Sequence, residues 1–205
     1  MLQIIFATGN EGKMREIRAI LTDVEAEIRS MKEAGLNPDI EEDGESFAEN
    51  AVIKAKAVAD ALAAEGKFRD CAVLADDSGL EIDCLNGEPG IYSARYLGED
   101  TPFNVKSREL LKRMEHVPEE ERTARFVCAI AAVFPDGETI TTRGTIEGRI
   151  GHALKGDNGF GYDPIFYLPE YGRTAAELTD EEKNRISHRS RALALMKEEL
   201  KKRKY

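Results

Sequence analysis

The chain has 205 residues, of which 41% are hydrophobic and 33% are charged, and its formal net charge is −10. This length and composition allow a buried core and are typical of a globular protein. No apolar run approaches the ~18 residues of a membrane-spanning helix, and the acidic balance argues against a nucleic-acid partner. An acidic protein can still bind a phosphate-bearing small molecule where its few cations converge and a metal ion screens the charge.

The beginning of the sequence and its cysteines bear on its compartment. Met1–Phe6 leads directly into an apolar pattern, without the basic flank and small-residue cleavage site of a secretory signal. The three cysteines, Cys71, Cys84 and Cys128, are odd in number and show no Cys-x-x-Cys spacing. These features predict reduced thiols, no disulfide or zinc framework, and a cytoplasmic protein.

The first predicted elements are a strand, a turn and a helix. Leu2–Ala7 is a continuous apolar run, which predicts a strand buried on both faces, and apolar residues at helical spacing follow from Met14 to Leu21. A glycine-containing turn that opens a helix presents backbone N–H groups to an anion, and Lys13 adds a positive charge. The alternative is an ordinary turn capped by Asn10, and the glycine spacing is not that of a Walker A loop. The turn is Thr8-Gly9-Asn10-Glu11-Gly12-Lys13.

A second strand is expected at Ala26–Ser30, followed by an acidic run and a long helix. Ser46 and Glu49 are typical of a capping box at the start of this helix. Acidic residues before a helix favour its dipole, and this is the simpler interpretation. The alternative is that one or two of these carboxylates bind Mg²⁺, which usually takes few protein carboxylates and keeps several waters. The acidic run is Glu41-Glu42-Asp43-Gly44-Glu45, and the predicted buried stripe of the helix is Phe47, Ala51, Ala55, Val58, Ala59 and Leu62.

The next buried strand is predicted to be short, Ala72–Ala75, and to end in Asp76-Asp77-Ser78-Gly79. Adjacent side chains of a strand point to opposite faces, so the two aspartates are not expected to share one task. One can face a cleft while the other caps the backbone or meets a basic partner. A simple turn is the alternative to metal binding or general-base catalysis by one of them.

The middle of the chain predicts a helix at Phe103–Met114 and two longer strands, Phe126–Phe134 and Thr139–Ile150. Together with the earlier elements these predict an α/β fold with a mixed sheet. The strand pair could support a second lobe, with a cleft between the two lobes. We therefore expect one domain over residues 1–205, with its second lobe centred on about residues 123–150.

The last polar segment is the glycine-rich loop Gly156–Pro164. Its glycines allow close approach of the backbone to a ligand, and Phe160 and Tyr162 offer a stacking platform for a base. The alternative is that both aromatic rings pack inward. Further donors gather around a helix start downstream and are candidates for recognition of a base or a phosphate: Lys183, His188 and Arg189.

Taken in order, these segments resemble the inosine-triphosphate pyrophosphatase family, in its bacterial-type XTP/dITP diphosphatase branch. The resemblance covers nearly the whole chain, and six blocks in register make coincidence an inadequate explanation. The blocks are Ala7-Thr8-Gly9-Asn10-Glu11-Gly12-Lys13; Glu41-Glu42-Asp43-Gly44 with Phe47 and Glu49-Asn50-Ala51; Ala75-Asp76-Asp77-Ser78-Gly79-Leu80; Gly90-Ile91-Tyr92-Ser93-Ala94-Arg95-Tyr96; Gly159-Phe160-Gly161-Tyr162-Asp163-Pro164; and Ala176-Glu177-Leu178 with Glu182-Lys183 and Ile186-Ser187-His188-Arg189.

The resemblance implies an elongated α/β protein with a long mixed sheet, a nucleotide cleft between two lobes, and a homodimer. It also implies a Mg²⁺-dependent hydrolase that removes the non-standard purine nucleotides ITP, dITP and XTP from the nucleotide pool. The reaction would be NTP + H₂O → NMP + diphosphate. Attack of water on the α-phosphorus needs charge neutralisation and positioning more than covalent catalysis.

The resemblance further implies roles for single residues. Asp77 is the expected proton acceptor and Mg²⁺ ligand, and Lys13 neutralises charge during catalysis. The second metal carboxylate is expected to be Glu41, with Glu42 as the alternative. The residues expected to grip the triphosphate are Thr8, Gly9, Asn10, Glu11, Gly12 and Lys13. Ser78 is expected to contact the substrate, and the residues expected to hold the base and adjacent groups are Phe160, Gly161, Tyr162, Asp163, Lys183, His188 and Arg189.

Base selectivity follows from hydrogen bonding at one position of the purine. Hypoxanthine and xanthine carry a 6-oxo acceptor where adenine carries an amino donor. Donors from His188, Arg189 or the loop would be left unpaired by adenine, and such a site rejects strongly. The sequence does not specify how guanine is excluded.

Three other functions are compatible with parts of the pattern. A Maf-like nucleotide pyrophosphatase shares the reaction but prefers other bases, and the His188-Arg189 block argues against it. A regulator that binds nucleotide without turnover would not need Lys13 and Asp77 together with the acidic pair. A Walker-type ATPase is disfavoured by the missing P-loop.

Overall fold

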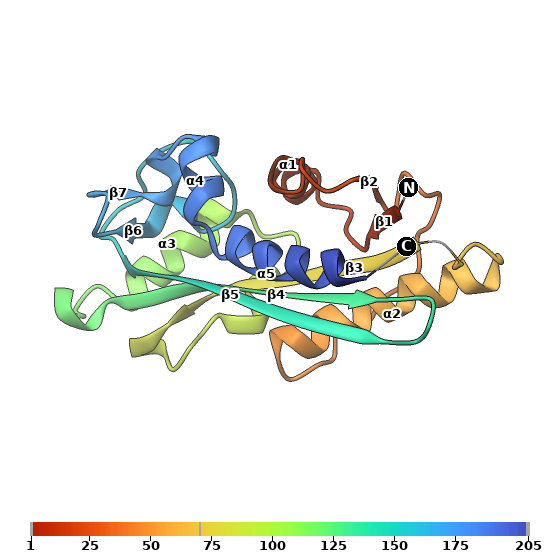
Figure 1. The fold of residues 1–205 in the computed structure, drawn as a ribbon. Helices are drawn as coiled ribbons and strands as arrows, with labels where there is room; N and C mark the ends of the chain where they lie inside the picture. Colours follow the sequence, from red (N-terminus) through yellow and green to blue (C-terminus); the bar gives the residue numbers. More distant parts are fainter. Residues whose placement is uncertain (1, 70, 204–205) are drawn as a thin grey trace. The chain divides into compact units, whose positions relative to one another are not determined.

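The structure, a computed structural model, describes residues 2–69 and 71–203. In these ranges seven strands and five α-helices follow one another in a mixed order, which confirms the predicted α/β class (Figure 1). In chain order they are β1 (Leu2–Phe6), α1 (Glu11–Ile20), β2 (Ala26–Ser30), α2 (Phe47–Ala64), β3 (Cys71–Ile82), α3 (Phe103–Arg113), β4 (Thr123–Val133), β5 (Thr139–Ile150), β6 (Phe166–Leu168), β7 (Arg173–Thr174), α4 (Asp180–Ile186) and α5 (His188–Lys202).

The strands form a mixed sheet in the order β2-β1-β3-β4-β5-β6-β7. β1 is parallel to both of its neighbours, with Ile4 opposite Ile28 of β2 and Ala72 of β3. β6 is antiparallel to β5 and to β7. The helices α1 and α2 make the crossovers that parallel neighbours require. The mixed sheet expected from the sequence is therefore confirmed.

The chain divides into two compact units. Unit 1 comprises Met1–Asp77, Cys128–Gly144 and Arg189–Tyr205, and unit 2 comprises Ser78–Val127 and Thr145–His188. Each of the long strands β3, β4 and β5 contributes residues to both units. The single domain over residues 1–205 with a second lobe centred on about residues 123–150 stays a prediction, and residues 1, 70, 204 and 205 of it lie outside the described residues.

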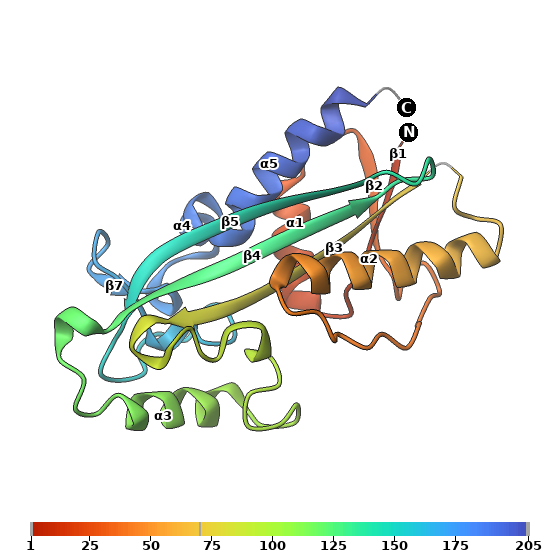
Figure 2. The same cartoon turned by 90° about the horizontal axis from the view of Figure 1, so that it is seen from below.

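The core of unit 1 lies on both faces of its strands. Alternate residues of β1 and β3, such as Ile4 and Leu74, pack with the apolar faces of α1 and α5. The residues between them, such as Ile5 and Val73, are buried as well, so β1 is covered on both faces as predicted. Helix α2 lies on the side of the strands opposite to α1, in front of them in Figure 2. All six residues of its predicted stripe are buried.

The start of α2 differs in one bond from the predicted capping box. The side chain of Ser46 accepts a hydrogen bond from the backbone N–H of Glu49 at 3.2 Å, as expected. The carboxylate of Glu49, however, accepts from the backbone N–H of Glu45 at 2.7 Å rather than from that of Ser46. The loop before the helix folds back onto the first turn, where Gly44 packs against Asn50. This close packing brings the earlier N–H within reach of the carboxylate.

The prediction of a short third strand was wrong. Strand β3 does not end before the two aspartates but continues through them from Cys71 to Ile82. Carboxylates inside a buried strand are tolerated only where cations or hydrogen bonds compensate them. Lys13 and Lys54 provide that compensation for Asp76 and Asp77, so the strand has no reason to stop.

Unit 2 encloses a second core formed by residues such as Leu80, Leu110 and Phe166. A buried arginine, Arg122, binds its segments together by donating to backbone carbonyls rather than to a carboxylate. Its acceptors are the carbonyl oxygens of Met114 and Gly151, both at 2.7 Å, of Ile150 at 2.8 Å, and of Val117 at 3.4 Å. The guanidinium thus links the end of α3 to the end of β5.

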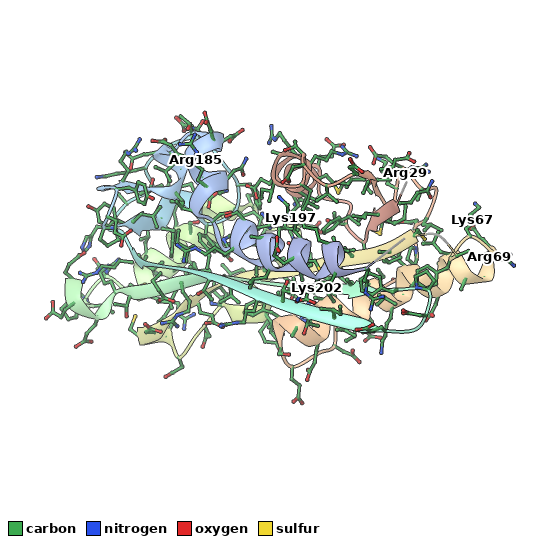
Figure 3. All side chains as sticks on the ribbon, viewed as in Figure 1. Arg29, Lys67, Arg69, Arg185, Lys197 and Lys202 are labelled. Atoms are coloured by element: carbon green, nitrogen blue, oxygen red, sulfur yellow. The ribbon has the colours of Figure 1, made fainter. Side chains whose placement is uncertain are left out.

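Basic side chains at the surface come from separate elements and pair locally (Figure 3). Lys67, in the loop after α2, contacts Glu65 at 2.6 Å, and Lys202 of α5 contacts Glu199 at the same distance. In unit 2, Arg185 pairs with Glu181 one helical turn away. Within the described ranges, no helix combines the length and the apolar character needed to cross a membrane.

Candidate functional site

The turn between β1 and α1 is built as a capped helix start. The side chain of Asn10 accepts from the backbone N–H of Lys13 at 3.0 Å, and the hydroxyl of Thr8 accepts from that of Asn10 at 3.2 Å. Asn10 is therefore the N-cap, as in the simpler interpretation of the sequence. The capped turn also aims Lys13 at the strand beside it, because the Nζ atom lies 3.2 Å from Oδ1 and 3.1 Å from Oδ2 of Asp76.

Asp76 is the centre of a buried ion-pair network. Its Oδ2 atom accepts from Arg189 Nη2 at 3.1 Å, and the same guanidinium also contacts Glu16 of α1. The side chains of Asp76 and Arg189 are each only 1% exposed. Burial by itself would raise the pKa of Asp76, but Lys13 and Arg189 outweigh it, so the pKa lies well below its ordinary value. Cations thus contact both oxygens of Asp76.

Asp77 faces a different cation. Its Oδ1 atom lies 3.1 Å from the Nζ atom of Lys54, which also contacts Oε2 of Glu42 at 3.0 Å. Its Oδ2 atom is buried and has no hydrogen-bond partner in the described part of the chain. Burial is the largest influence on the pKa of Asp77 and raises it, although Lys54 opposes the shift. Lys54 therefore anchors one oxygen of Asp77, while the other has no partner among the described residues.

Lys54 is the functional candidate that the sequence interpretation missed. It lies on the buried face of α2, between the alanines of the predicted apolar stripe. Burial lowers its pKa, but Asp77, Asp76 and Glu42 together outweigh that effect and raise the pKa above its ordinary value. A signal was present in the sequence, because a lysine inside a buried stripe needs a carboxylate partner.

The acidic loop contributes two carboxylates in different settings. Glu42 is half-buried and its carboxylate forms an ion pair with Lys54, whereas Glu41 is exposed. Over residues 2–69 and 71–203, no three His, Cys, Asp or Glu side chains gather as a metal-binding group. The unpartnered Oδ2 of Asp77 nevertheless fits a hard cation such as Mg²⁺, which binds one or two carboxylates and completes its shell with phosphate oxygens and water.

In unit 2, the glycine-rich loop is organised by Asp163. Its Oδ2 atom accepts from the backbone N–H of Phe160 at 2.8 Å and from Lys183 Nζ at 2.6 Å. Both charged side chains are buried, and the ammonium lies 4.6 Å from the centroid of the Phe160 ring. Gly159 has φ +74°, and a Cβ atom there would lie 2.2 Å from Asp163 Oδ2. Only glycine fits this position.

The two aromatic residues of the loop have different environments. Tyr162 is buried, donates its hydroxyl to the carbonyl oxygen of Ser93 at 2.8 Å, and packs edge-to-face with the Phe103 ring at a centroid distance of 5.2 Å. Burial raises the pKa of this phenol. Phe160 is only half-buried. The inward-packing alternative therefore holds for Tyr162, which anchors the loop, while a substrate role for it stays a prediction.

The structure brings three of the predicted site residues, Asp163, Lys183 and His188, together with Ser187 in unit 2. A cavity of about 10 Å³ is lined by apolar side chains and by Asp163, Lys183, Ser187 and His188. The His188 ring stacks on Phe126, with a centroid distance of 5.0 Å and an interplanar angle of 18°. Ser78, at the start of the unit 2 part of β3, is half-buried, as is Gly161. Arg189, by contrast, is engaged by the carboxylates of unit 1.

Comparisons with known proteins agree with this architecture over its full length. The sequence profile of the Ham1 family matches residues 4–199. The chain belongs to the Ham1 family. Among relatives, the dITP/XTP pyrophosphatase of Clostridium perfringens is 48% identical over 201 residues, which cover 98% of each chain. The family match therefore covers nearly the whole chain.

Solved structures of the family resemble this chain closely. The Ham1 protein of Staphylococcus aureus has a TM-score of 0.85 and 42% identity, covering 98% of this chain and 100% of its own. A HAM1 protein from Coxiella burnetii has a TM-score of 0.87 and 40% identity, covering 99% and 100%. The seven-stranded mixed sheet is therefore the family fold.

Proposed function

We propose that this Ham1-family chain hydrolyses dITP, XTP and ITP to the nucleoside monophosphate and diphosphate, and so removes non-standard purines from the nucleotide pool. The first support is the name dITP/XTP pyrophosphatase that its relatives of 48% and 47% identity bear. The observation that carries the proposal is Asp77, a buried carboxylate with one oxygen fixed by Lys54 and the other without a partner among the described residues.

The geometry of unit 1 suggests how its residues act. A water oxygen attacks the α-phosphorus, the bond to the bridging oxygen of the β-phosphate breaks, and diphosphate leaves with the bond's electron pair. The carboxylate of Asp77, which Lys54 holds at Oδ1, orients the attacking water and accepts its proton. Lys13 and the N–H groups of its turn neutralise the triphosphate, while Lys54 holds Asp77 in place.

The metal ion proposed for this site is Mg²⁺. Asp77 would hold it together with Glu41, because Glu42 already serves as a counter-ion of Lys54. When bound, the ion supplies charge neutralisation for the phosphate oxygens and polarises the phosphorus.

Base recognition is proposed for unit 2. The half-buried Phe160 ring offers a stacking surface, and the loop backbone, Lys183 and His188 offer donors to a 6-oxo group. Arg189 was expected among these donors, but its guanidinium is held by Asp76 and Glu16. We therefore propose that Arg189 orders Asp76 instead of reading the base.

A substrate panel with identified products tests the proposal. ITP, XTP, dITP, GTP, dTTP and UTP are each incubated with Mg²⁺, and the phosphate product is separated. Fast release of diphosphate from ITP and XTP is expected. Preference for dTTP and UTP would favour a Maf-like enzyme, orthophosphate would favour an ATPase-like reaction, and binding without any product would favour a regulator.

A matched pair of variants tests the role of Asp77. Asp77→Asn keeps the shape of the side chain but cannot accept the proton, so kcat should fall by about a hundredfold or more, while ITP still binds. Asp60→Asn, on the exposed side of α2, is the control and should leave kcat unchanged. Turnover close to that of the control would contradict the proposed role.

We also propose a homodimer in the cytoplasm. The support is the family resemblance and, for the compartment, the odd number of cysteines and the absence of Cys-x-x-Cys spacing in the sequence. Sedimentation equilibrium measures the association, and a mass equal to that of one chain at micromolar concentration would contradict it.

A further inference from the structure

The motif Glu49-Asn50-Ala51 contains a buried polar residue that the proposed reaction does not use. Asn50 is fully buried on α2. Its Oδ1 atom accepts a hydrogen bond from the backbone N–H of Gly44 at 2.9 Å. Its Nδ2 atom has no hydrogen-bond partner within the described ranges. A buried amide with an unused donor costs folding stability, so its retention calls for a reason.

The orientation of this amide is dictated by the acidic loop. The N–H of Gly44 needs an acceptor, so the oxygen of Asn50 must face it and the NH₂ group must face away. The amide thus gives up its own pairing to hold Gly44. The contact is tight as well, because a Cβ atom on Gly44 would lie 2.8 Å from Asn50 Oδ1 and 2.8 Å from the Cβ atom of Glu49.

The anchored loop carries a carboxylate of the site. Glu42 lies two residues before Gly44, and Lys54 lies four residues after Asn50 on the same helix. Residues four apart share one helix face, so the amide and the ammonium are neighbours on α2. The ammonium contacts Glu42 at 3.0 Å and Asp77 at 3.1 Å.

We infer that Asn50 is a positioning residue of the metal site: by holding Gly44 on α2, it keeps the carboxylates of residues 41–45 where a divalent cation bound to Asp77 Oδ2 needs them. This inference rests on the proposed function for the identity of the site. A neutral amide suits position 50, because it supplies an acceptor to the backbone N–H of Gly44 without adding a charge beside Lys54.

The test measures cation affinity in the full chain without nucleotide, using Mn²⁺ as the probe and electron paramagnetic resonance to count free ion. Asn50→Leu removes the acceptor and should weaken Mn²⁺ binding by about tenfold or more, as loss of an outer-shell partner typically does. Asn50→Asp keeps an acceptor oxygen and, when protonated in this buried place, a donor as well. It should bind Mn²⁺ within about threefold of wild type.

Two further variants separate positioning from general damage. Gly44→Ala displaces the loop from the other side of the same contact and should weaken Mn²⁺ binding as Asn50→Leu does; it decides the matter if Asn50→Leu does not fold. Ser107→Ala alters another buried side chain with an unpartnered polar atom, in unit 2, and should leave Mn²⁺ affinity unchanged. Circular dichroism verifies folding of each variant.

The outcomes distinguish this inference from the proposed function. Folded Asn50→Leu and Gly44→Ala variants with wild-type Mn²⁺ affinity would overturn the inference while leaving ITP hydrolysis by the wild type intact. Absence of Mn²⁺ binding by the wild type would overturn it too. Tight Mn²⁺ binding that weakens as expected, in a protein that hydrolyses none of the nucleotides, would support the inference and reject the proposed function.

Discussion

Asp76→Asn is the substitution for which the structure allows the most explicit magnitude. The side chain is 1% exposed and contacts Lys13 and Arg189 at 3.1 Å each. Removing one partner of a buried ion pair costs about 3–5 kcal/mol, because the other charge is left uncompensated. Here the loss is moderated, since Arg189 keeps Glu16 and the Lys13 side chain is 19% exposed.

We therefore expect Asp76→Asn to lower the free energy of unfolding by about 3 kcal/mol. For a chain of this size that corresponds to a fall in Tm of roughly 6–12 °C. The assay is urea unfolding followed by circular dichroism, with calorimetry for Tm. Asp83→Asn is the matched control, because Asp83 contacts Arg125 at 2.8 Å but is 41% exposed, and exposed pairs contribute about 0–1 kcal/mol.

A loss for Asp76→Asn no larger than that of Asp83→Asn would refute the reasoning. A double-mutant cycle adds a second check. Once Asp76 is neutral, Lys13 no longer has its partner, so adding Lys13→Met should cost less than it does in the wild type, by at least about 0.5 kcal/mol. Strict additivity of the two substitutions would show that the ammonium and the carboxylate do not interact in solution.

Three further predictions concern other sites. Gly159→Ala should lower kcat/KM for ITP at least about tenfold, because the new methyl group would displace Asp163. The control is Gly137→Ala, at a position where φ is also positive but no atom lies within 4 Å of the added Cβ atom. Equal effects of the two substitutions on kcat/KM would contradict the argument. Lys106 is fully buried, its ammonium donates to the carbonyl oxygen of Ala94 rather than to a carboxylate, and burial lowers its pKa. Lys106→Met should therefore leave the free energy of unfolding at neutral pH unchanged or raise it by up to about 2 kcal/mol, and should abolish the stability that the wild type gains as pH rises from the lowered pKa towards 10.5. A marked loss measured by urea unfolding would contradict this. The backbone N–H of Ser30 and the guanidinium of Arg18 hold the pKa of Glu33 at about 2, so its contribution to stability is present above pH 4.5 and is lost as pH falls towards 2. Glu33→Gln should reduce this acid dependence of the free energy of unfolding, measured by urea unfolding at several pH values. Identical pH profiles of variant and wild type would be the contrary result.

Local pattern was sufficient for most elements of the fold. The strands at Ala26–Ser30 and Thr139–Ile150 and the helix from Phe47 appear as predicted, because apolar spacing and caps act within a few residues of the chain. The strand predicted at Phe126–Phe134 is present as well, but it begins three residues earlier, at Thr123. The failure at Asp76 was of a different kind. Two acidic residues end a strand in isolation, and only cations from α1, α2 and α5 allow it to continue.

The candidate site divides in the same way. The sequence by itself determined which segments carry chemistry, since the glycine turn, the acidic loop, the paired aspartates and the loop around Phe160 are visible as motifs. Only the tertiary structure decided which charge meets which. Lys13 and Arg189 form ion pairs with Asp76, whereas Lys54 forms ion pairs with Asp77 and Glu42. The partners of a buried charge are contributed by residues distant in the chain, and the sequence records the need for such a partner but not its identity.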